Sequence, residues 1–238
     1  MFKRPLMMAA SALVLVAFGA LAADDGEKLF NGKDLAGWEG NPAFWKVEDG
    51  TLTGESGGAN PCNKTTFLIL KDRQVGDFEL TARFRFLSDQ GNSGIQYRST
   101  VADAKAFDVK GYQADFEAGP TYTGILYEQG GRGILVNRGD KMEIAADGTR
   151  KVTGHFENVK GLKLEKGRWY TQRIIAKGSH LIQEIDGVRT MEVVDNDAKR
   201  SASRGCLALQ LHAGPAMKVQ FKDIVLKETP AEGAKPAK

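Results

Sequence analysis

One seven-residue segment alternates polar side chains with apolar ones. In residues 111–117 (GYQADFE), the two-residue period of a strand sends Gln113, Asp115 and Glu117 to one face and the apolar side chains to the other. Successive residues on one face lie roughly 6.6 Å apart, so both carboxylates can act on a single sugar. This face is predicted to belong to a carbohydrate site.

Two further segments show the same alternation. GIQYR sends Gln96 and Arg98 to one face, and LQLHA does the same with Gln210 and His212. Side chains that donate and accept hydrogen bonds suit a polyhydroxylated ligand, so we expect all seven polar residues to form the floor of one cleft. The alternative interpretation is three ordinary solvent-facing strands. Repeated glutamine beside charged groups and an imidazole favours the site.

A glycine-rich loop is expected to complete the pocket. Residues 127–133 (YEQGGRG) have a flexible backbone that can close over a ligand and bring Glu128 and Arg132 inward. No helix is predicted after this loop, so it does not fit a phosphate-binding loop.

Metal chemistry has weaker support in the sequence. A divalent cation held by Asp115, Glu117 and His212 is chemically compatible, but nothing in their spacing demands it. HExxH, paired CxxC and GxSxG motifs do not occur, which argues against zincin, structural-zinc and α/β-hydrolase chemistry. His155 and His180 lie in polar turns and are predicted to be surface histidines.

The elements that position these residues are predicted to be strands. Short β-rich runs punctuated by Gly, Asp and Asn recur every 8 to 15 residues or so, and helical periodicity is scarce after the first residues. Asp77–Leu87 (DFELTARFRFL) alternates most clearly, and Asp49-Gly50 and Asp186-Gly187 have the residues of tight hairpin turns. This pattern favours two packed antiparallel sheets.

The ends of the chain differ from this domain. Lys3 and Arg4 precede an apolar run that closes on Ala-Leu-Ala, so residues 1–22 are predicted to be a secretory signal peptide. We expect a periplasmic or secreted protein without a stable membrane anchor. Residues 23–228 are predicted to form a single β-sandwich domain, and residues 229–238 a disordered tail.

Charge and cysteine content limit the partners. Cleavage after residue 22 removes Lys3 and Arg4, so that 31 basic residues face 30 acidic ones, and no basic stripe indicates a nucleic-acid partner. Cys62 and Cys206 can form a disulfide in an oxidising compartment or be two small buried hydrophobic residues. Their spacing does not decide between these alternatives.

Several motifs together resemble the 3-keto-disaccharide hydrolase family. The likeness runs from about Leu29 to Lys227 and rests on LFNGKDLAGW, WKVEDGTLTG, DFEL, GNSGI, GYQAD, TGILY and FKDI. The resemblance implies a concanavalin A-like, laminarinase-type jelly roll of two antiparallel sheets. It also implies cleavage of glycosides already oxidised at C3, with Gln113–Glu117 and His212 on the family's polar strand and late histidine segment.

The implied reaction makes specific demands on the site. A ketone at C3 acidifies the C2 hydrogen, so a base can remove it, the enolate can expel the C1 substituent, and water can then add. This chemistry needs a base and donors for the enolate oxygen. We expect His212 or Glu117 to be the base, Arg98 and Gln113 to be the donors, and Asp115 to orient groups or bind a metal.

Two other functions remain open. A retaining glycosidase would use Asp115 and Glu117 as nucleophile and acid, roughly 5 to 5.5 Å apart. Glucanases with a jelly roll generally have a third acid in line on that strand, however, and Gln113 stands in its place here. A non-catalytic carbohydrate-binding module would need exposed aromatic platforms, but the three tryptophans lie in segments that look structural.

Overall fold

Strands make up almost all of the regular structure. The computed structural model describes residues 26–229, so the predicted signal peptide and residues 230–238 lie outside the described residues. Within that range one short 3-10 helix, η1 (Glu157–Val159), accompanies the strands. No helix between residues 26 and 229 is long and apolar enough to cross a membrane. The strands are β1 (Glu27–Lys28), β2 (Trp38–Glu39), β3 (Trp45–Glu48), β4 (Thr51–Ser56), β5 (Thr66–Leu70), β6 (Phe78–Phe86), β7 (Asn92–Asp103), β8 (Asp108–Glu117), β9 (Leu126–Gln129), β10 (Gly133–Val136), β11 (Asp140–Ile144), β12 (Arg150–His155), β13 (Tyr170–Lys177), β14 (His180–Ile185), β15 (Val188–Asp195), β16 (Cys206–Leu211) and β17 (Met217–Glu228).

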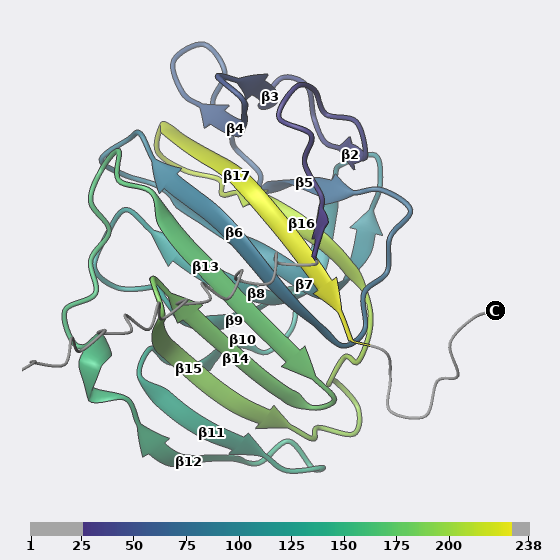
Figure 1. Ribbon diagram of the computed structural model, residues 1–238, viewed down its shortest axis with the longest axis vertical. Coiled ribbons are helices and arrows are strands. Elements are labelled where there is room, and N and C mark those ends of the chain that lie inside the picture. Colours follow the sequence, from purple (N-terminus) through teal and green to yellow (C-terminus); the bar gives the residue numbers. More distant parts are fainter. Residues whose placement is uncertain (1–25, 230–238) are drawn as a thin grey trace, which may run out of the picture.

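The strands form two sheets that face each other. One has ten strands in the order β12-β11-β15-β14-β13-β6-β17-β4-β3, with β1 added beside β17, and the other has seven in the order β10-β9-β8-β7-β16-β5-β2. Figure 1 shows β6, β13, β14 and β17 in front of β7, β8 and β9. Every pair is antiparallel except β11 with β15. The predicted all-β, jelly-roll sandwich is thus confirmed, with one parallel pair added.

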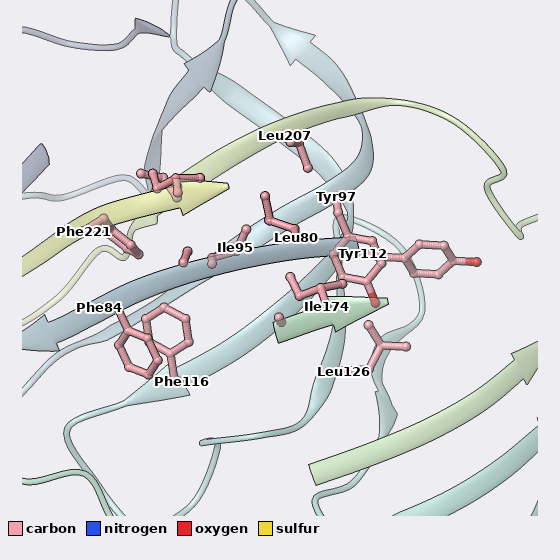
Figure 2. Packing of buried hydrophobic residues seen from close by; sticks show 14 of the residues in the cluster. Leu80, Phe84, Ile95, Tyr97, Tyr112, Phe116, Leu126, Ile174, Leu207 and Phe221 are labelled. Atoms are coloured by element: carbon pink, nitrogen blue, oxygen red, sulfur yellow. The ribbon is translucent and has the colours of Figure 1, made fainter. Parts of the chain in front are cut away.

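The core lies between the sheets. In β6 the alternation read from the sequence is confirmed, because the residues from Phe78 to Phe86 are buried at every second position. Phe84 of β6 stacks on Phe116 of β8 with ring centroids 3.8 Å apart, and Figure 2 shows this pair between the sheets. Tyr112 is on the same face of β8 as Phe116. The alternate residues of β8 therefore face outward.

Both predicted hairpin turns are present. Asp49 and Gly50 have φ values of 49° and 69° and join β3 to β4. Asp186 and Gly187 have φ values of 50° and 78° and join β14 to β15. Two consecutive residues with positive φ form the turn whose twist matches that of the flanking strands, which explains the Asp-Gly sequences.

The cysteines are free, so the disulfide alternative is wrong and the buried-hydrophobe alternative is confirmed. Cys62 packs in the core between the sheets. Cys206 lies in a separate apolar cluster with Phe67, Ile69, Val109 and Ala208. In β16, Cys206 and Ala208 of this outer cluster alternate with leucines of the core. The two thiols therefore lie on opposite sides of the seven-stranded sheet.

Candidate active site

The outer face of the seven-stranded sheet holds a cavity of about 420 Å³. That volume lies in the range of small-molecule sites. Five strands and the loops at their ends supply its walls. The lining residues are Asn92, Gln113, Asp115, Glu117, Tyr122, Ile125, Tyr127, Gln129, Ile134, Gln210 and His212. Five of the predicted site residues are therefore brought together: Gln113, Asp115, Glu117, Gln210 and His212.

Asp115 is the most buried acid of the cavity, with 6% of its surface exposed. Its Oδ1 accepts a hydrogen bond from Asn92 Nδ2 at 2.6 Å, and its Oδ2 accepts one from Gln113 Nε2 at 3.0 Å. Burial raises the pKa of Asp115 to about 7, and the Glu117 charge adds to this, while the two hydrogen bonds act in the opposite direction. A carboxyl group of this kind can gain or lose a proton near neutral pH.

Glu117 lines the cavity as expected, but its carboxylate also holds a loop. Oε1 accepts the backbone N–H groups of Thr121 and Tyr122, the latter at 2.8 Å. The backbone N–H of Glu117 donates to the Thr123 hydroxyl. These bonds fix the turn after β8 and place Tyr122, which is 43% exposed, at the cavity.

His212 follows β16 and is exposed at the cavity. Its Nδ1 lies 2.5 Å from the Ala213 carbonyl oxygen. A carbonyl can only accept, so Nδ1 carries the proton and Nε2 of the neutral ring is left as an acceptor. In this tautomer Nε2 can accept a proton, and the role of His212 as a base stays a prediction.

Two amide oxygens at the cavity have no hydrogen-bond partner among residues 26–229: Oε1 of Gln210 and Oδ1 of Asn92. Gln210 is only 1% exposed. Buried amide oxygens are normally satisfied, so these two are candidate acceptors for ligand hydroxyl groups. The sugar contact of Gln210 stays a prediction, and Asn92, which sequence reasoning missed, is a second candidate of the same kind.

Aromatic residues of the cavity were also missed. Tyr127 pairs with Gln113 across β8 and β9, and Ile134 pairs with Tyr127 across β9 and β10. Strand alternation therefore puts Tyr127 and Gln129 on the cavity face, a signal available from the sequence. Tyr122 enters from the loop that Glu117 holds, which strand alternation does not predict. A tyrosine ring offers an apolar face and a polar edge to a sugar.

Gln96 is on the expected face but does not line the cavity. It is fully buried and donates from Nε2 to Gln113 Oε1 at 2.9 Å. Its own Oε1 accepts from the Ser99 hydroxyl at 2.6 Å. The predicted direct contact between Gln96 and the sugar is therefore wrong, because Gln96 lies beside Gln113 on the neighbouring strand and outside the cavity.

The predicted position of Arg98 is wrong. Arg98 has a φ of 47°, and the pairing of β7 with β8 shifts register between Tyr97 and Thr100. This bulge breaks the two-residue alternation on which the prediction relied. The guanidinium instead donates to the carbonyls of Gly76 and Gly178 and to the Asp77 carboxylate.

Glu128 and Arg132 do not close over the cavity either. Glu128 has the parity of Leu126 in β9 and so faces away from Tyr127 and the cavity. Arg132 pairs with Glu128 at 2.6 Å and with Asp195 at 2.7 Å, and all three side chains are buried. The glycine-rich turn thus forms a buried ion cluster, which explains its charged residues without a ligand.

Asp115, Glu117 and His212 do not form a metal-binding arrangement. Among the described residues no group of three or more His, Cys, Asp or Glu side chains is placed to hold a metal ion. The two remaining histidines are at the surface, as predicted, but they lie at strand ends and not in turns. His155 ends β12 and contacts Asp140, and His180 begins β14 and contacts Glu192.

Comparison with protein families identifies the family of this chain. The sequence profile of the 3-keto-alpha-glucoside-1,2-lyase-like domain matches residues 25–227. The chain belongs to this family. The resemblance inferred from the motifs is confirmed, and the 3-keto-alpha-glucoside-1,2-lyase-like domain relates the protein to carbohydrate-active or carbohydrate-binding proteins. No curated protein matches the chain.

Solved structures share the sandwich at low sequence identity. Carbohydrate-binding module CBM66 from Bacillus subtilis is 16% identical with a TM-score of 0.54, and the match covers 81% of this chain and 96% of that one. A candidate glycosyl hydrolase from Parabacteroides distasonis ATCC 8503 is 18% identical with a TM-score of 0.51, covering 85% and 98%. A galectin-like protein of unknown function from Bacillus subtilis is 9% identical with a TM-score of 0.52, covering 83% and 92%. These similarities establish the fold alone.

Proposed function

We propose that the protein cleaves 3-keto-glycosides by removing the C2 proton, expelling the C1 substituent and adding water. The observation that carries the proposal is Asp115, a buried carboxylate in the cavity whose pKa is raised to about 7. A base with a pKa near the working pH is well matched to abstracting a proton next to a ketone. Family membership supports a sugar as the substrate.

The cavity residues divide the steps between them. Asp115 takes the C2 proton, and the electrons of that C–H bond form the C2–C3 double bond while negative charge moves to the C3 oxygen. The second N–H of the Gln113 amide and the N–H groups of the Gln210 amide are the donors for this oxygen. Collapse of the enolate re-forms the C3 carbonyl, moves the electron pair to the C1–C2 bond and breaks the C1–O bond. The leaving oxygen takes up a proton from water. Water then adds across C1 and C2, with its oxygen on C1 and a proton returned to C2.

Asp115 thereby replaces His212 or Glu117, the bases expected from the sequence. Both oxygens of Asp115 accept N–H bonds, which favours the ionised form that a base needs. Glu117 Oε1 is already held by two backbone N–H groups of its loop. In a retaining glycosidase one of these carboxyls would have to present an O–H to the leaving oxygen. The observed bonding favours proton abstraction over that mechanism.

A non-catalytic sugar-binding function is the second candidate. Tyr122 and Tyr127 line the cavity beside the unpartnered amide oxygens of Asn92 and Gln210, a combination that can hold a neutral sugar without reaction. An assay that measures both binding and cleavage of the sugar separates this function from catalysis.

The test compares matched native and 3-keto-glucosides in D2O with the purified protein. Release of the aglycone from the keto substrate alone, with deuterium incorporated at C2, supports the proposal. Asp115→Asn is expected to lower kcat about 10²- to 10⁴-fold, the usual contribution of a general base. Cleavage of the native glycoside would indicate a glycosidase, and binding of either sugar without turnover would indicate a binding module.

We also propose that the protein works beyond the inner membrane, in the periplasm or outside the cell. The support is the Lys3-Arg4, apolar and Ala-Leu-Ala pattern of residues 1–22. Cell fractionation with N-terminal sequencing should find a protein that begins at Ala23. A cytoplasmic protein that retains Met1 would contradict this localisation.

A further inference from the structure

A chain of buried hydrogen bonds runs from β7 to the carboxylate of Asp115. Ser99 Oγ donates to Gln96 Oε1 at 2.6 Å, Gln96 Nε2 donates to Gln113 Oε1 at 2.9 Å, and Gln113 Nε2 donates to Asp115 Oδ2 at 3.0 Å. Ser99, Gln96 and Gln113 are each at most 1% exposed. Ser99 and Gln96 do not line the cavity.

The direction of this chain is set by chemistry at its two ends. An ionised carboxylate only accepts hydrogen bonds, so Gln113 must turn its NH2 group toward Asp115 and its carbonyl toward Gln96. Gln96 must then turn its NH2 toward Gln113 and its carbonyl toward Ser99, whose hydroxyl supplies the proton. Reversal of both amides satisfies the chain only if Asp115 is protonated and donates. The amide orientation is therefore coupled to the protonation state of Asp115.

The geometry points to Ser99 and Gln96 as positioning residues that hold Gln113 as a hydrogen-bond donor to the Asp115 carboxylate, and so keep Asp115 in the form that accepts a proton. The expected effect on turnover rests on the proposed function. The hydrogen-bond chain is a property of the substrate-free protein and does not depend on it. Successive bonds polarise one another, so Gln96 also strengthens the bond that Gln113 makes to Asp115.

Gly94 provides the space that the chain requires. A Cβ atom at this position would lie 2.6 Å from Gln113 Cγ and 2.8 Å from the Ala114 carbonyl oxygen. Gln113 therefore leans across Gly94, and only a residue without a side chain allows this close approach. Gly94 pairs with Asp115 across β7 and β8, so the glycine lies next to the carboxylate that the chain reaches.

Other titratable groups face Asp115 as well. Glu117 lies two residues along β8, His212 follows β16, and the phenols of Tyr122 and Tyr127 come from the loop after β8 and from β9. Of these, the Glu117 charge contributes to the raised pKa of Asp115. The test therefore changes a residue that touches none of these four groups.

Gln96→Met is the decisive variant, because it keeps the length of the side chain and removes its donor and acceptor. Gln220→Met is the matched control: Gln220 is also a buried strand glutamine, bonded to Thr53 and Arg85 in the ten-stranded sheet, away from the cavity. The titration of Asp115 in the substrate-free protein is followed by NMR of the ¹³C-labelled carboxyl group. Gln96→Met should move it upward by about one pH unit, because the ionised form loses support. Gln220→Met should leave it unchanged.

Kinetics with the 3-keto-glucoside give a second readout. Gln96→Met should lower kcat about fivefold at neutral pH with KM within about twofold, and raising the pH should recover the loss as Asp115 ionises. Ser99→Ala should shift both readouts in the same direction by a smaller amount, and it serves if Gln96→Met does not fold. A loss of kcat that persists at high pH, or an Asp115 titration equal to that of the wild type in both variants, overturns the inference. A shifted titration in a protein that does not cleave the keto substrate would refute the proposed function and retain the hydrogen-bond chain.

Discussion

Asp115 is the residue at which burial and hydrogen bonding act in opposite directions. Burial penalises the charged carboxylate, while Asn92 and Gln113 stabilise it through N–H donors. A surface aspartate has a pKa of about 3.9, so it is ionised at neutral pH but holds a proton too weakly to be a good base. Partial compensation leaves a carboxylate that is ionised and still basic near pH 7.

This compensation should be visible in protein stability. The folded-state pKa of Asp115, about 7, lies above the value of about 3.9 in an unfolded chain, so the folded protein binds the extra proton between these two values. The contribution of Asp115 to the free energy of unfolding is thus present below about pH 4 and is lost as the pH rises to about 7. Relative to Asp115→Asn, the wild type should lose up to ~1.4 kcal/mol per pH unit between about pH 5 and pH 7.

Urea unfolding of both proteins at about pH 5, 6 and 7 measures this difference. Asp89→Asn is the control, because Asp89 is exposed and its ion pair is with a surface lysine. A difference between wild type and Asp115→Asn that does not change with pH would show that Asp115 titrates like an ordinary surface acid.

At the scale of single elements, the loop after β8 depends on Glu117. Since Oε1 of Glu117 accepts the N–H groups of Thr121 and Tyr122, the carboxylate fixes the loop that brings Tyr122 to the cavity. Glu117→Gln can keep one amide oxygen as an acceptor but loses the negative charge, which weakens both bonds. The variant is expected to raise KM about three- to tenfold with kcat within about threefold, the pattern of a lost binding contribution.

Steady-state kinetics of Glu117→Gln beside Asp115→Asn test this assignment. A kcat that falls as far in Glu117→Gln as in Asp115→Asn would restore Glu117 as the base. Tyr122→Phe offers a further comparison, because it keeps the ring at the cavity and leaves the Glu117 bonds to the loop backbone unchanged.

Gly94 in β7 is predicted to be intolerant of a larger residue. A methyl group there meets Gln113 and the backbone oxygen of Ala114, and the second of these contacts cannot be relieved by a side-chain rotation. Gly94→Ala is expected to lower the free energy of unfolding by ~1–3 kcal/mol and kcat by at least tenfold. Urea unfolding and kinetics measure the two effects.

Gly154→Ala is the matched control for this variant. Gly154 lies in the edge strand β12, and a Cβ atom there would meet nothing closer than 3.8 Å. Its stability should stay within about 0.5 kcal/mol of the wild type. A Gly94→Ala protein with normal stability and turnover would show that Gln113 does not need to lie across β7.

Strand alternation explains both what the sequence predicted and what it missed. It placed Gln113, Asp115 and Glu117 correctly because β8 is regular from Tyr112 to Glu117. It failed at Arg98 because a bulge in β7 depends on how the strand meets its neighbours, which a single segment does not reveal. Applied consistently to β9 it would have selected Tyr127 over Glu128.

The chemical roles of the site residues were harder to predict from the sequence than their positions on the strands. That Asp115 is more buried than Glu117 follows from the loops and strands that cover each carboxylate, and residue types alone do not show this. The partner of each amide is also a tertiary property. Gln96 and Gln210 are both glutamines in similar strand contexts, yet Gln96 is enclosed beside Gln113 and Gln210 lines the cavity.

For the whole molecule, Arg98 joins the two sheets at one end of the sandwich. It lies in β7 of the seven-stranded sheet, while Asp77 precedes β6 and Gly178 follows β13 in the ten-stranded sheet. The guanidinium bonds at 2.8 Å to Asp77 and at 2.6 Å to the Gly178 carbonyl, with its side chain 1% exposed. A buried cation that satisfies several acceptors on the opposite sheet restricts how the sheets can separate.

Arg98→Met should therefore destabilise the protein without removing a group from the cavity. The variant leaves the Gly76 and Gly178 carbonyls without the guanidinium donor and leaves the Asp77 carboxylate with the Gly178 N–H alone. A loss of ~3–5 kcal/mol is expected for breaking a buried ion pair from one side. Urea unfolding measures this loss, and kcat of the folded protein should change less than about threefold. Arg83→Met is the control, because Arg83 is partly exposed on the ten-stranded sheet and its contact with Asp223 is 3.8 Å long. Normal stability with strongly reduced kcat in Arg98→Met would return Arg98 to the catalytic role that the sequence suggested, and would require the end of the sandwich to open toward the substrate.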